Sequence, residues 1–417
     1  MSARRILLVT YFYPPSRDTG VLRPAAMAKY LRRLGHDVTV LTTSAYGELP
    51  GDEGVVRTAD AQRWRAKARC AERVDALYDS DTYAGRPHPL SRIIVPEPLV
   101  LAWAPFARRA ALRLHRERPF DAVITTSPPE SVHLVGRALH RRGVAWVADV
   151  RDGWTFEPLR PRFPTAAQRR LDERLERRWL GDADRVVCVS DPVAEDLRAR
   201  GVAQPVVVAN GWDPDLAPAD TADSAQATGL LDPERVSLVY TGRFGSYGRD
   251  PRALVEGVRL FARDDPEAAA RLELVIAGPL TDDEARLFAG DVAPARITVA
   301  GSLERARALA LQREAEALLL VAQPTRSQLL NIKLFEYLAS GRPILALAAG
   351  TEAGRLVAEI GGTSVRADDP AAIATALGDV VRRPPDAPPP DAVAPYTYPA
   401  PAERLAAVVE DAIVAAG

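Results

Sequence analysis

Residues 6–42 read ILLVTYFYPPSRDTGVLRPAAMAKYLRRLGHDVTVLT and decide the fold class of the chain. Short apolar runs at Ile6–Thr10 and Val38–Thr42 have the composition of strands that are buried on both faces. Between them, apolar residues recur at three- and four-residue spacing over Arg23–Leu34, and Gly35 follows, as at the C-terminal end of a helix. The stretch therefore predicts a parallel strand–helix–strand unit.

The same alternation continues along the chain in two blocks. In the first block we expect further strands at Asp121–Thr126, Val144–Asp149 and Arg185–Ser190, the last followed by a helix that Asp191 caps. In the second block we expect strands at Ser237–Tyr240, Leu272–Ala277, Ile297–Ala300, Ala317–Ala322 and Pro343–Leu347. Two blocks of similar size predict an α/β fold with two doubly wound, Rossmann-like domains facing a central cleft.

The periodicity also predicts the domain boundaries. We expect an N-terminal domain at residues 1–213, interrupted by an irregular polar insertion at residues 46–95. An Ala-, Asp- and Pro-rich linker at residues 214–234 leads to a C-terminal domain at residues 235–395. A last helix, at residues 396–417, is expected to cross back to the N-terminal domain.

Composition excludes several classes of protein. The 417 residues include 54 Lys and Arg against 55 Asp and Glu, and this balance argues against a nucleic-acid-binding protein. The two cysteines, Cys70 and Cys188, are isolated, which excludes a disulfide scaffold and a cysteine-based zinc site. We find no signal peptide and no apolar run of about 18 residues. We therefore expect a cytoplasmic protein without a transmembrane segment.

One basic, amphipathic stretch leaves two interpretations open. Trp103–Arg118 has the pattern of helices that touch anionic membranes. A solvated helix face packed on its own domain explains the same pattern, and the near-neutral net charge favours it. We therefore expect no membrane contact, although a peripheral one stays an alternative. The oligomeric state does not follow from the sequence.

The clearest chemical signal lies in Gln323–Leu347, QPTRSQLLNIKLFEYLASGRPILAL. The pattern predicts a strand end, a polar turn, a helix over Leu330–Ala339 and another strand. Ligands of doubly wound sheets bind beyond the carboxyl ends of the strands, where this helix begins. Its first N–H groups, those of Leu329, Leu330 and Asn331, would favour an anion such as a diphosphate.

Two charged residues of this predicted helix fit the same ligand. Lys333, in the first turn, would place a second positive charge near the anion. Glu336, one turn further on, has a carboxylate that accepts hydrogen bonds from a diol such as that of ribose. Either residue alone is more often a solvated surface group, and their occurrence together at a strand-to-helix junction favours a site.

Several segments, taken in order, resemble one family. KLFEYLASGRPILAL, from Lys333, resembles the donor-binding segment of the family-4 retaining glycosyltransferases, which have the GT-B fold and are here of a bacterial type. The resemblance extends over nearly the whole chain through ILLVTYFYPPSRDTG, VCVSDPVAEDL, VVVANGWDP, LVYTGRFGSYGRDPRALVEGV, LELVIAGPL and ITVAGSL. Single pieces are moderately specific, whereas the ordered set is highly specific.

The resemblance implies roles for residues of the C-terminal domain. Glu336 matches the glutamate that holds the donor ribose. Gln328 stands where the family usually has a first glutamate that contacts the donor sugar, so the identity of that sugar stays open. Arg243 matches the phosphate-clamping arginine. Its usual lysine partner is missing, and Arg249 or Lys333 is the candidate substitute.

The resemblance also implies backbone contacts with the donor. Gly20 matches an N-domain glycine whose backbone approaches the diphosphate. Gly301, Ser302 and Leu303 match the segment that contacts the nucleobase. On the acceptor side, His133 is a candidate to contact the diphosphate or the acceptor, and Asp152 is a candidate to orient an acceptor hydroxyl. A helix-capping histidine and a loop-tying aspartate are the structural alternatives.

These matches imply a retaining glycosyltransferase that moves a sugar from a nucleotide diphosphate sugar to a natural-product, small-molecule or saccharide acceptor. Arg243, Lys333 and the helix N–H groups would stabilise the leaving diphosphate, so neither a metal ion nor a cofactor is expected. Two alternatives stay open. One is a nucleotide-sugar epimerase on the same fold, and the other is a catalytically silent protein that binds nucleotide sugars.

Overall fold

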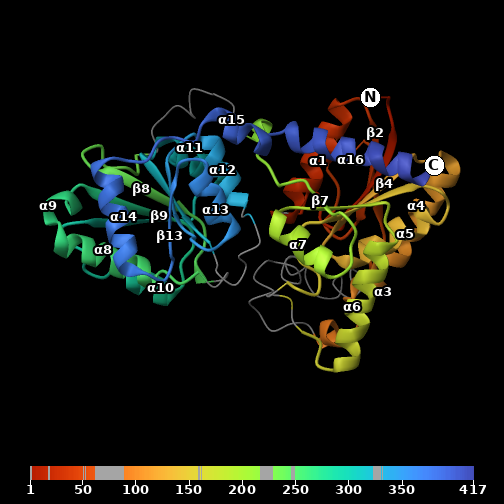
Figure 1. Cartoon of the computed structure of the whole chain (residues 1–417), viewed down its shortest axis with the longest axis horizontal. Helices are drawn as coiled ribbons and strands as arrows, with labels where there is room; N and C mark the ends of the chain where they lie inside the picture. Colours follow the sequence, from red (N-terminus) through yellow and green to blue (C-terminus); the bar gives the residue numbers. More distant parts are fainter. Residues whose placement is uncertain are drawn as a thin grey trace. The chain divides into compact units, whose positions relative to one another are not determined.

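The computed structural model describes residues 2–16, 19–49, 51, 53–61, 89–157, 160, 162–216, 229–245, 249–322, 330 and 332–417. The chain divides into two compact units (Figure 1). Unit 1 comprises Met1–Asn210 and Tyr398–Gly417, and unit 2 comprises Gly211–Thr397. Each unit is built on its own parallel sheet and is described by itself.

Unit 1 contains a seven-stranded sheet in the order β3-β2-β1-β4-β5-β6-β7. Its described ladders are all parallel. The strands are β1 (Arg5–Val9), β2 (Asp37–Thr43), β3 (Val55–Thr58), β4 (Ala122–Ser127), β5 (Ala145–Val150), β6 (Arg185–Cys188) and β7 (Val206–Val207). The order reverses between β1 and β4, which makes the carboxyl end of these two strands the switch point of a doubly wound sheet.

Helices cover both faces of this sheet. They are α1 (Leu22–Arg33), α3 (Leu99–Ala102), α4 (Ala104–Glu117), α5 (His133–His140), α6 (Ala166–Gly181), α7 (Asp191–Ala199) and α16 (Ala400–Ala416). Successive strand residues face opposite sides of a sheet. Ile6 and Leu8 of β1 therefore share a core with α1 and α16. Trp146 of β5 lies on the other face, against α5.

The C-terminal helix α16 belongs to unit 1, as predicted (Figure 1). Leu405 and Val409 are buried in the core that also contains residues of β1 and α1. Glu410 accepts hydrogen bonds from the Arg4 guanidinium at 2.9 and 2.7 Å. The chain thus returns from unit 2 to complete one face of the first sheet.

Unit 2 contains a six-stranded sheet in the order β10-β9-β8-β11-β12-β13, again with parallel ladders throughout its described strands. The strands are β8 (Val236–Thr241), β9 (Leu272–Ala277), β10 (Arg296–Gly301), β11 (Ala317–Val321), β12 (Ile344–Leu347) and β13 (Thr363–Val365). The switch point here lies between β8 and β11, so the loops after these two strands share one edge of the sheet.

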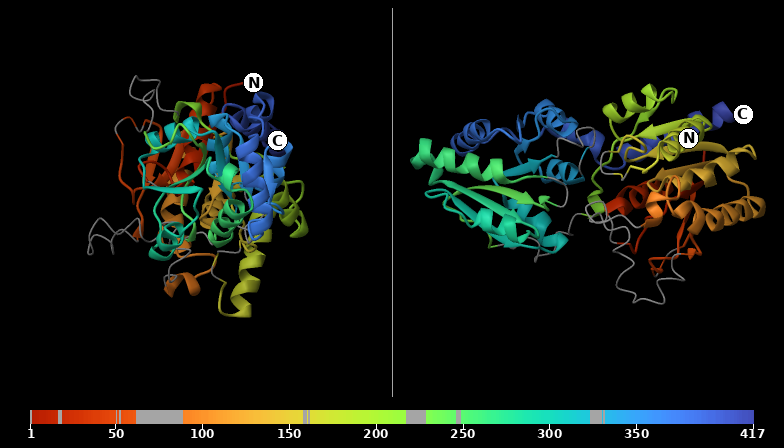
Figure 2. Two further views of the ribbon diagram at one scale, coloured as in Figure 1. Left: turned by 90° about the vertical axis from the view of Figure 1, so that its left-hand side faces the viewer. Right: turned by 90° about the horizontal axis from the view of Figure 1, so that it is seen from below.

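Helices again cover both faces (Figure 2). They are α8 (Arg252–Asp264), α9 (Pro266–Ala269), α10 (Asp282–Phe288), α11 (Arg305–Glu314), α12 (Ile332–Ser340), α13 (Glu352–Glu359), α14 (Pro370–Arg382) and α15 (Pro390–Val393). Leu319 and Leu345 pack with α8 and α14. Their neighbours Leu318 and Leu320 pack on the opposite face with α12 and α13.

The predicted α/β class with two doubly wound sheets is confirmed, and two details are wrong. The expected irregular insertion at residues 46–95 contains an edge strand, β3, because Val55–Thr58 pairs with β2. Asp191 does not cap α7: the N-cap residue is Ser190, and Asp191 lies in the first turn. Trp103–Arg118 contains the predicted helix, as α4.

Candidate active site

Helix α12 follows strand β11 at the switch point of unit 2. Its apolar side chains, including Leu334 and Leu338, are buried against the sheet, and Gly341, with a φ of +67°, ends the helix. The helix predicted over Leu330–Ala339 is confirmed with a later start, at Ile332. Leu330 is 7% exposed and packs in the same core, so its side chain is structural.

Three of the residues predicted at the start of this helix, Gln328, Leu329 and Asn331, lie outside the described residues. Lys333 and Glu336 are described, in the first and second turns of α12. The positive end of the helix dipole adds to the charge of Lys333 at this position.

Glu336 is a buried carboxylate held between two cations. Its side chain is 7% exposed, and its Oε1 lies 3.0 Å from Nη1 of Arg305, the first residue of α11. Its Oε2 lies 3.9 Å from Nζ of Lys333. The two oxygens of this carboxylate keep lone pairs for further hydrogen-bond donors.

Lys333 reaches back across the end of strand β8. A Cβ on Gly242 would lie 2.7 Å from Cε of Lys333, so the glycine leaves room for the lysine stem. Burial lowers the pKa of Lys333; the Glu336 carboxylate opposes this shift, whereas the nearby Arg249 and Arg305 guanidinium groups add to it. The site thus gathers three cations around one carboxylate, a balance that favours an anionic ligand.

The loop after β8 supplies Arg243 and Arg249. Arg243 is exposed, and its carbonyl oxygen accepts hydrogen bonds from the Tyr240 hydroxyl at 2.8 Å and from Nη1 of Arg249 at 3.0 Å. Glu284 of α10 accepts a hydrogen bond from the Gly245 N–H at 2.6 Å. These bonds fix both ends of the described part of the loop beside Gly242.

Gly301 is the last residue of β10, and Ser302 and Leu303 follow it in the turn that leads to α11. Gly301 has a φ of +68°, a left-handed conformation that glycine adopts without strain. The turn leads directly to Arg305, which contacts Glu336. The Arg305–Glu336 ion pair therefore connects the segment predicted to contact the base, Gly301–Leu303, with Glu336, the residue predicted to hold the ribose.

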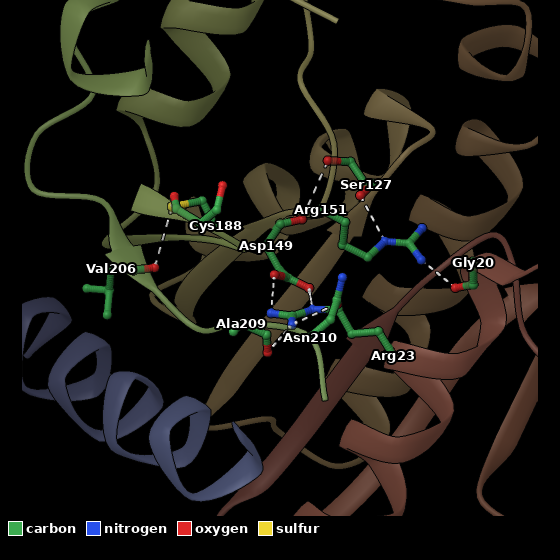
Figure 3. Close-up of polar contacts among 10 residues, drawn as sticks. Gly20, Arg23, Ser127, Asp149, Arg151, Cys188, Val206, Ala209 and Asn210 are labelled. Atoms are coloured by element: carbon green, nitrogen blue, oxygen red, sulfur yellow. Dashed lines mark hydrogen bonds and ion pairs between the residues drawn. The ribbon is translucent and has the colours of Figure 1, made fainter. Parts of the chain in front are cut away.

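In unit 1, Arg151 joins the Gly20 turn to the end of strand β4 (Figure 3). Its buried guanidinium donates hydrogen bonds to the carbonyl oxygens of Ser127 and Pro128, both at 3.0 Å, and of Gly20. Gly20 lies in a short 3-10 turn, Thr19–Val21, immediately before α1. Arg151 thus positions the backbone that the sequence predicts beside a diphosphate.

A second buried arginine supports the same edge of the sheet (Figure 3). Arg23 of α1 forms a two-pronged ion pair with Asp149 of β5, at 2.9 and 3.0 Å. It also donates to the carbonyl oxygen of Ala209, at 3.0 Å. Because both charges are buried and their hydrogen bonds are satisfied, loss of either one would leave an unpaired charge in the interior.

His133 and Asp152, the predicted acceptor-side residues, lie in different environments. His133 opens α5 and is fully buried, and burial lowers its pKa to about 3. It is therefore a neutral imidazole at physiological pH. Asp152 follows β5 and is half-buried; its carboxylate contributes to the raised pKa of Glu130.

Sequence reasoning missed a buried acidic group in unit 1, formed by Glu97, Glu130 and Asp172 around Arg160. Nη1 of Arg160 lies 2.8 Å from Asp172. Burial, reinforced by the Glu130 carboxylate, raises the pKa of Glu97 to about 8. Burial also raises the pKa of Glu130. The first two glutamates therefore hold at least one proton near neutral pH.

Comparisons with known proteins agree with this architecture. The model of a "Glycosyl transferase 4-like domain" matches residues 21–211, and the model of "Glycosyl transferases group 1" matches residues 235–383. The two matches fall on the two units in turn. The chain belongs to the glycosyltransferases. A comparison with the curated proteins found no match.

Solved structures show that this glycosyltransferase has the GT-B fold. Sucrose-phosphate synthase from Thermosynechococcus elongatus is 17% identical, with a TM-score of 0.63 and coverage of 99% of this chain and 100% of that chain. HepE from Anabaena, in complex with UDP and glucose, is 14% identical, with a TM-score of 0.56 and coverage of 99% and 97%. UDP-GlcNAc 2-epimerase from Methanocaldococcus jannaschii is 12% identical, with a TM-score of 0.54 and coverage of 97% and 99%.

The structure brings together only part of the predicted site of this glycosyltransferase. Lys333, Glu336 and Arg249 form one charged cluster, and Arg243 lies beside it on the same sheet edge. Sequence reasoning missed Arg305. Its position two residues after Leu303 was the available signal, because a helix opening at the switch-point edge directs its first side chains toward the ligand side.

The described residues contain neither a metal-binding cluster nor a membrane-spanning helix. No three His, Cys, Asp or Glu side chains there gather in a way that suits a metal ion. None of the helices in the described part of the chain has the length and apolar character needed to cross a membrane.

Proposed function

We propose that this glycosyltransferase is a retaining, metal-independent enzyme of the family-4 type. It transfers a sugar from a nucleotide diphosphate sugar to a natural-product, small-molecule or saccharide acceptor. Unit 2 binds the donor and unit 1 binds the acceptor. The nucleotide sugar is a co-substrate, and no cofactor is required.

The observation that carries the proposal is the cluster at the start of α12. One buried carboxylate, Glu336, lies beside Lys333 and Arg305, with Arg249 close by. Glu336 would accept hydrogen bonds from the ribose diol. Lys333, Arg243 and the first N–H groups of α12 would receive the diphosphate. The turn Gly301–Leu303 would contact the base.

Chemistry requires stabilisation of the negative charge that develops on the diphosphate as the glycosidic bond breaks. The cations of unit 2 supply that stabilisation from fixed positions. In the front-face displacement that the family resemblance implies, the acceptor attacks from the side of the leaving diphosphate. No side chain becomes covalently attached to the sugar. Asp152 would orient the acceptor hydroxyl, and His133 would contact the acceptor or the diphosphate.

The direct test measures release of nucleoside diphosphate from a panel of UDP-, GDP- and dTDP-sugars with a panel of acceptors. Replacing Lys333 by Ala or Glu336 by Gln removes a charge-assisted contact of about 1.5–3 kcal/mol, which is a loss of about 10- to 150-fold in kcat/KM. Glu359→Gln on helix α13 is the matched control, because its exposed carboxylate pairs with Arg355 of the same helix. Equal activity of all three variants would exclude the proposed donor site.

The same assay separates the alternatives. Formation of an epimeric nucleotide sugar in the absence of acceptor would identify an epimerase, a function borne by one of the similar structures. Tight donor binding without turnover across the acceptor panel would identify a silent binding protein. The anomeric configuration of the isolated product, determined by NMR, tests retention.

A further inference from the structure

Three fully buried side chains of unit 1 form a hydrogen-bonded chain that ends at His133. The indole Nε1–H of Trp146, on β5, donates to Oγ1 of Thr125, on β4, at 2.8 Å. Oγ1 of Thr125 lies 2.8 Å from Nδ1 of His133, the first residue of α5. Trp146, Thr125 and His133 all have 0% exposure. The contacts are short and shielded from water, so they are well defined.

The geometry of this chain depends on a glycine. A Cβ on Gly136 would lie 2.2 Å from Nε1 of Trp146 and 2.5 Å from its Cε2. Gly136 stands one helical turn after His133, so both residues lie on one face of α5. The missing side chain lets the indole lie close against the helix, where its N–H reaches Thr125.

Counting hydrogens fixes the tautomer of His133. An indole nitrogen only donates, so Oγ1 of Thr125 accepts the bond from Trp146. The single hydroxyl hydrogen of Thr125 then has one acceptor within the described part of the chain, Nδ1 of His133. Nδ1 is therefore unprotonated. Because the low pKa of His133, about 3, keeps the ring neutral, its one N–H hydrogen lies on Nε2.

This Nε2–H is buried and has no hydrogen-bond partner among the described residues. Buried N–H groups in native proteins are nearly always paired, so this one calls for a partner from outside the described residues, such as an oxygen atom of a ligand. The ring is held in place by Trp154, which stacks on it with a centroid distance of 6.2 Å and an interplanar angle of 21°. His133 also stands where β4 leads into a helix, at the ligand-binding edge of the sheet.

We propose that Trp146 and Thr125 are positioning residues that fix His133 as a hydrogen-bond donor, through Nε2–H, to an oxygen atom of a substrate. This inference rests on the proposed function and gives His133 one defined task. His133 neither removes a proton nor carries positive charge during the reaction. The recognised atom is a lone-pair oxygen, and it comes either from a phosphate or from a sugar hydroxyl.

The first experiment tests the tautomer and does not depend on activity. The full chain, labelled with ¹⁵N-histidine, contains five histidines, and His133→Gln assigns the signal of interest. The expected spectrum shows His133 protonated on Nε2 alone, with a hydrogen-bonded Nδ1, and unchanged between pH 6 and 8. A proton on Nδ1, or a titration within that range, would overturn the proposal even if the enzyme transfers sugar.

The second experiment identifies the oxygen, using UDP, UDP-glucose and glucose as probes. A change in the Nε2–H resonance with UDP alone indicates a phosphate oxygen. A change with UDP-glucose or glucose, but not with UDP, indicates a sugar hydroxyl. Nucleotide binding by calorimetry with no change in this resonance under any probe would refute the role of His133 and leave the donor site intact.

Variants of Thr125 separate positioning from folding. Thr125→Val keeps the shape of the side chain but removes its hydroxyl. The Nδ1 resonance of His133 should then move to that of a nitrogen without a hydrogen bond, and kcat/KM should fall about 3- to 10-fold. Thr125→Ser should restore both. Gly136→Ala, which displaces Trp146, should lower kcat/KM, whereas Gly181→Ala in α6, where a Cβ meets nothing within 4 Å, should not. Equal rates for Val and Ser at position 125 would contradict the proposal.

Discussion

Removal of Arg305 should weaken nucleotide binding through its effect on Glu336. The pair joins a half-exposed arginine, 47% exposed, to a carboxylate that is 7% exposed, at 3.0 Å. Exposed ion pairs contribute roughly 0.2–1 kcal/mol and hydrogen bonds to charged groups about 1.5–3 kcal/mol. We take about 1 kcal/mol for this intermediate case, which corresponds to a fivefold weaker Kd for the preferred nucleoside diphosphate in Arg305→Ala.

Calorimetry with two ligands tests the mechanism of that effect. If Arg305 acts by orienting the Glu336 carboxylate toward the ribose, the loss should disappear for a 2′,3′-dideoxy nucleotide, which lacks the hydroxyls that Glu336 receives. Arg263→Ala is the matched control, since Arg263 is exposed and pairs with its neighbour Asp264. An equal loss for both ligands would show that Arg305 touches the nucleotide itself, and no loss for either would refute the orienting role.

Three further predictions concern pH and metal ions. Because the pKa of Lys333 is lowered from its usual 10.5, Lys333 loses its charge at a lower pH than usual, and kcat/KM should therefore begin to fall below pH 10.5. Lys333→Arg should move that fall to higher pH. A pH profile that stays the same in this variant would exclude Lys333 as the titrating group. Transfer should persist in EDTA, since cations of unit 2 neutralise the diphosphate; a loss that Mg²⁺ restores would contradict this. Glu97, with its pKa raised to about 8, holds a proton in the folded state that the unfolded chain releases above about 4.5, so the free energy of unfolding should fall as pH rises between these values. Glu97→Gln should therefore increase the free energy of unfolding by about 1–2 kcal/mol at pH 8 but not at pH 4, and Tm should rise accordingly. Tm curves of the variant and the unaltered chain that run parallel across this pH range would refute the assignment.

Much of the fold could be predicted because buried parallel strands are short, continuous apolar runs. Leu272–Ala277 was predicted with the observed bounds, and α12 was predicted from its one-sided apolar pattern and Gly341. The edge strand β3 was missed because Val55–Thr58 is four residues long and lies within a polar stretch. Edge strands are half-covered, so the apolar signal that marks central strands is weak there.

The candidate site could be predicted only where its residues share one segment. Lys333 and Glu336 lie one turn apart on a helix, and their proximity follows from the sequence alone. The pairing of Arg305 with Glu336, by contrast, joins the N-terminal parts of two helices, α11 and α12, whose distance depends on the strand order of the sheet. The role of Arg151 was missed for the same reason, because its three carbonyl partners come from two other segments.

The most direct test of the account is a crystal structure of the full chain with the nucleoside diphosphate that binds most tightly. We expect the ribose hydroxyls within hydrogen-bond distance of Glu336 and the diphosphate at the start of α12, beside Lys333. A nucleotide bound elsewhere, with Glu336 still paired to Arg305 and remote from the ligand, would contradict the proposed donor site.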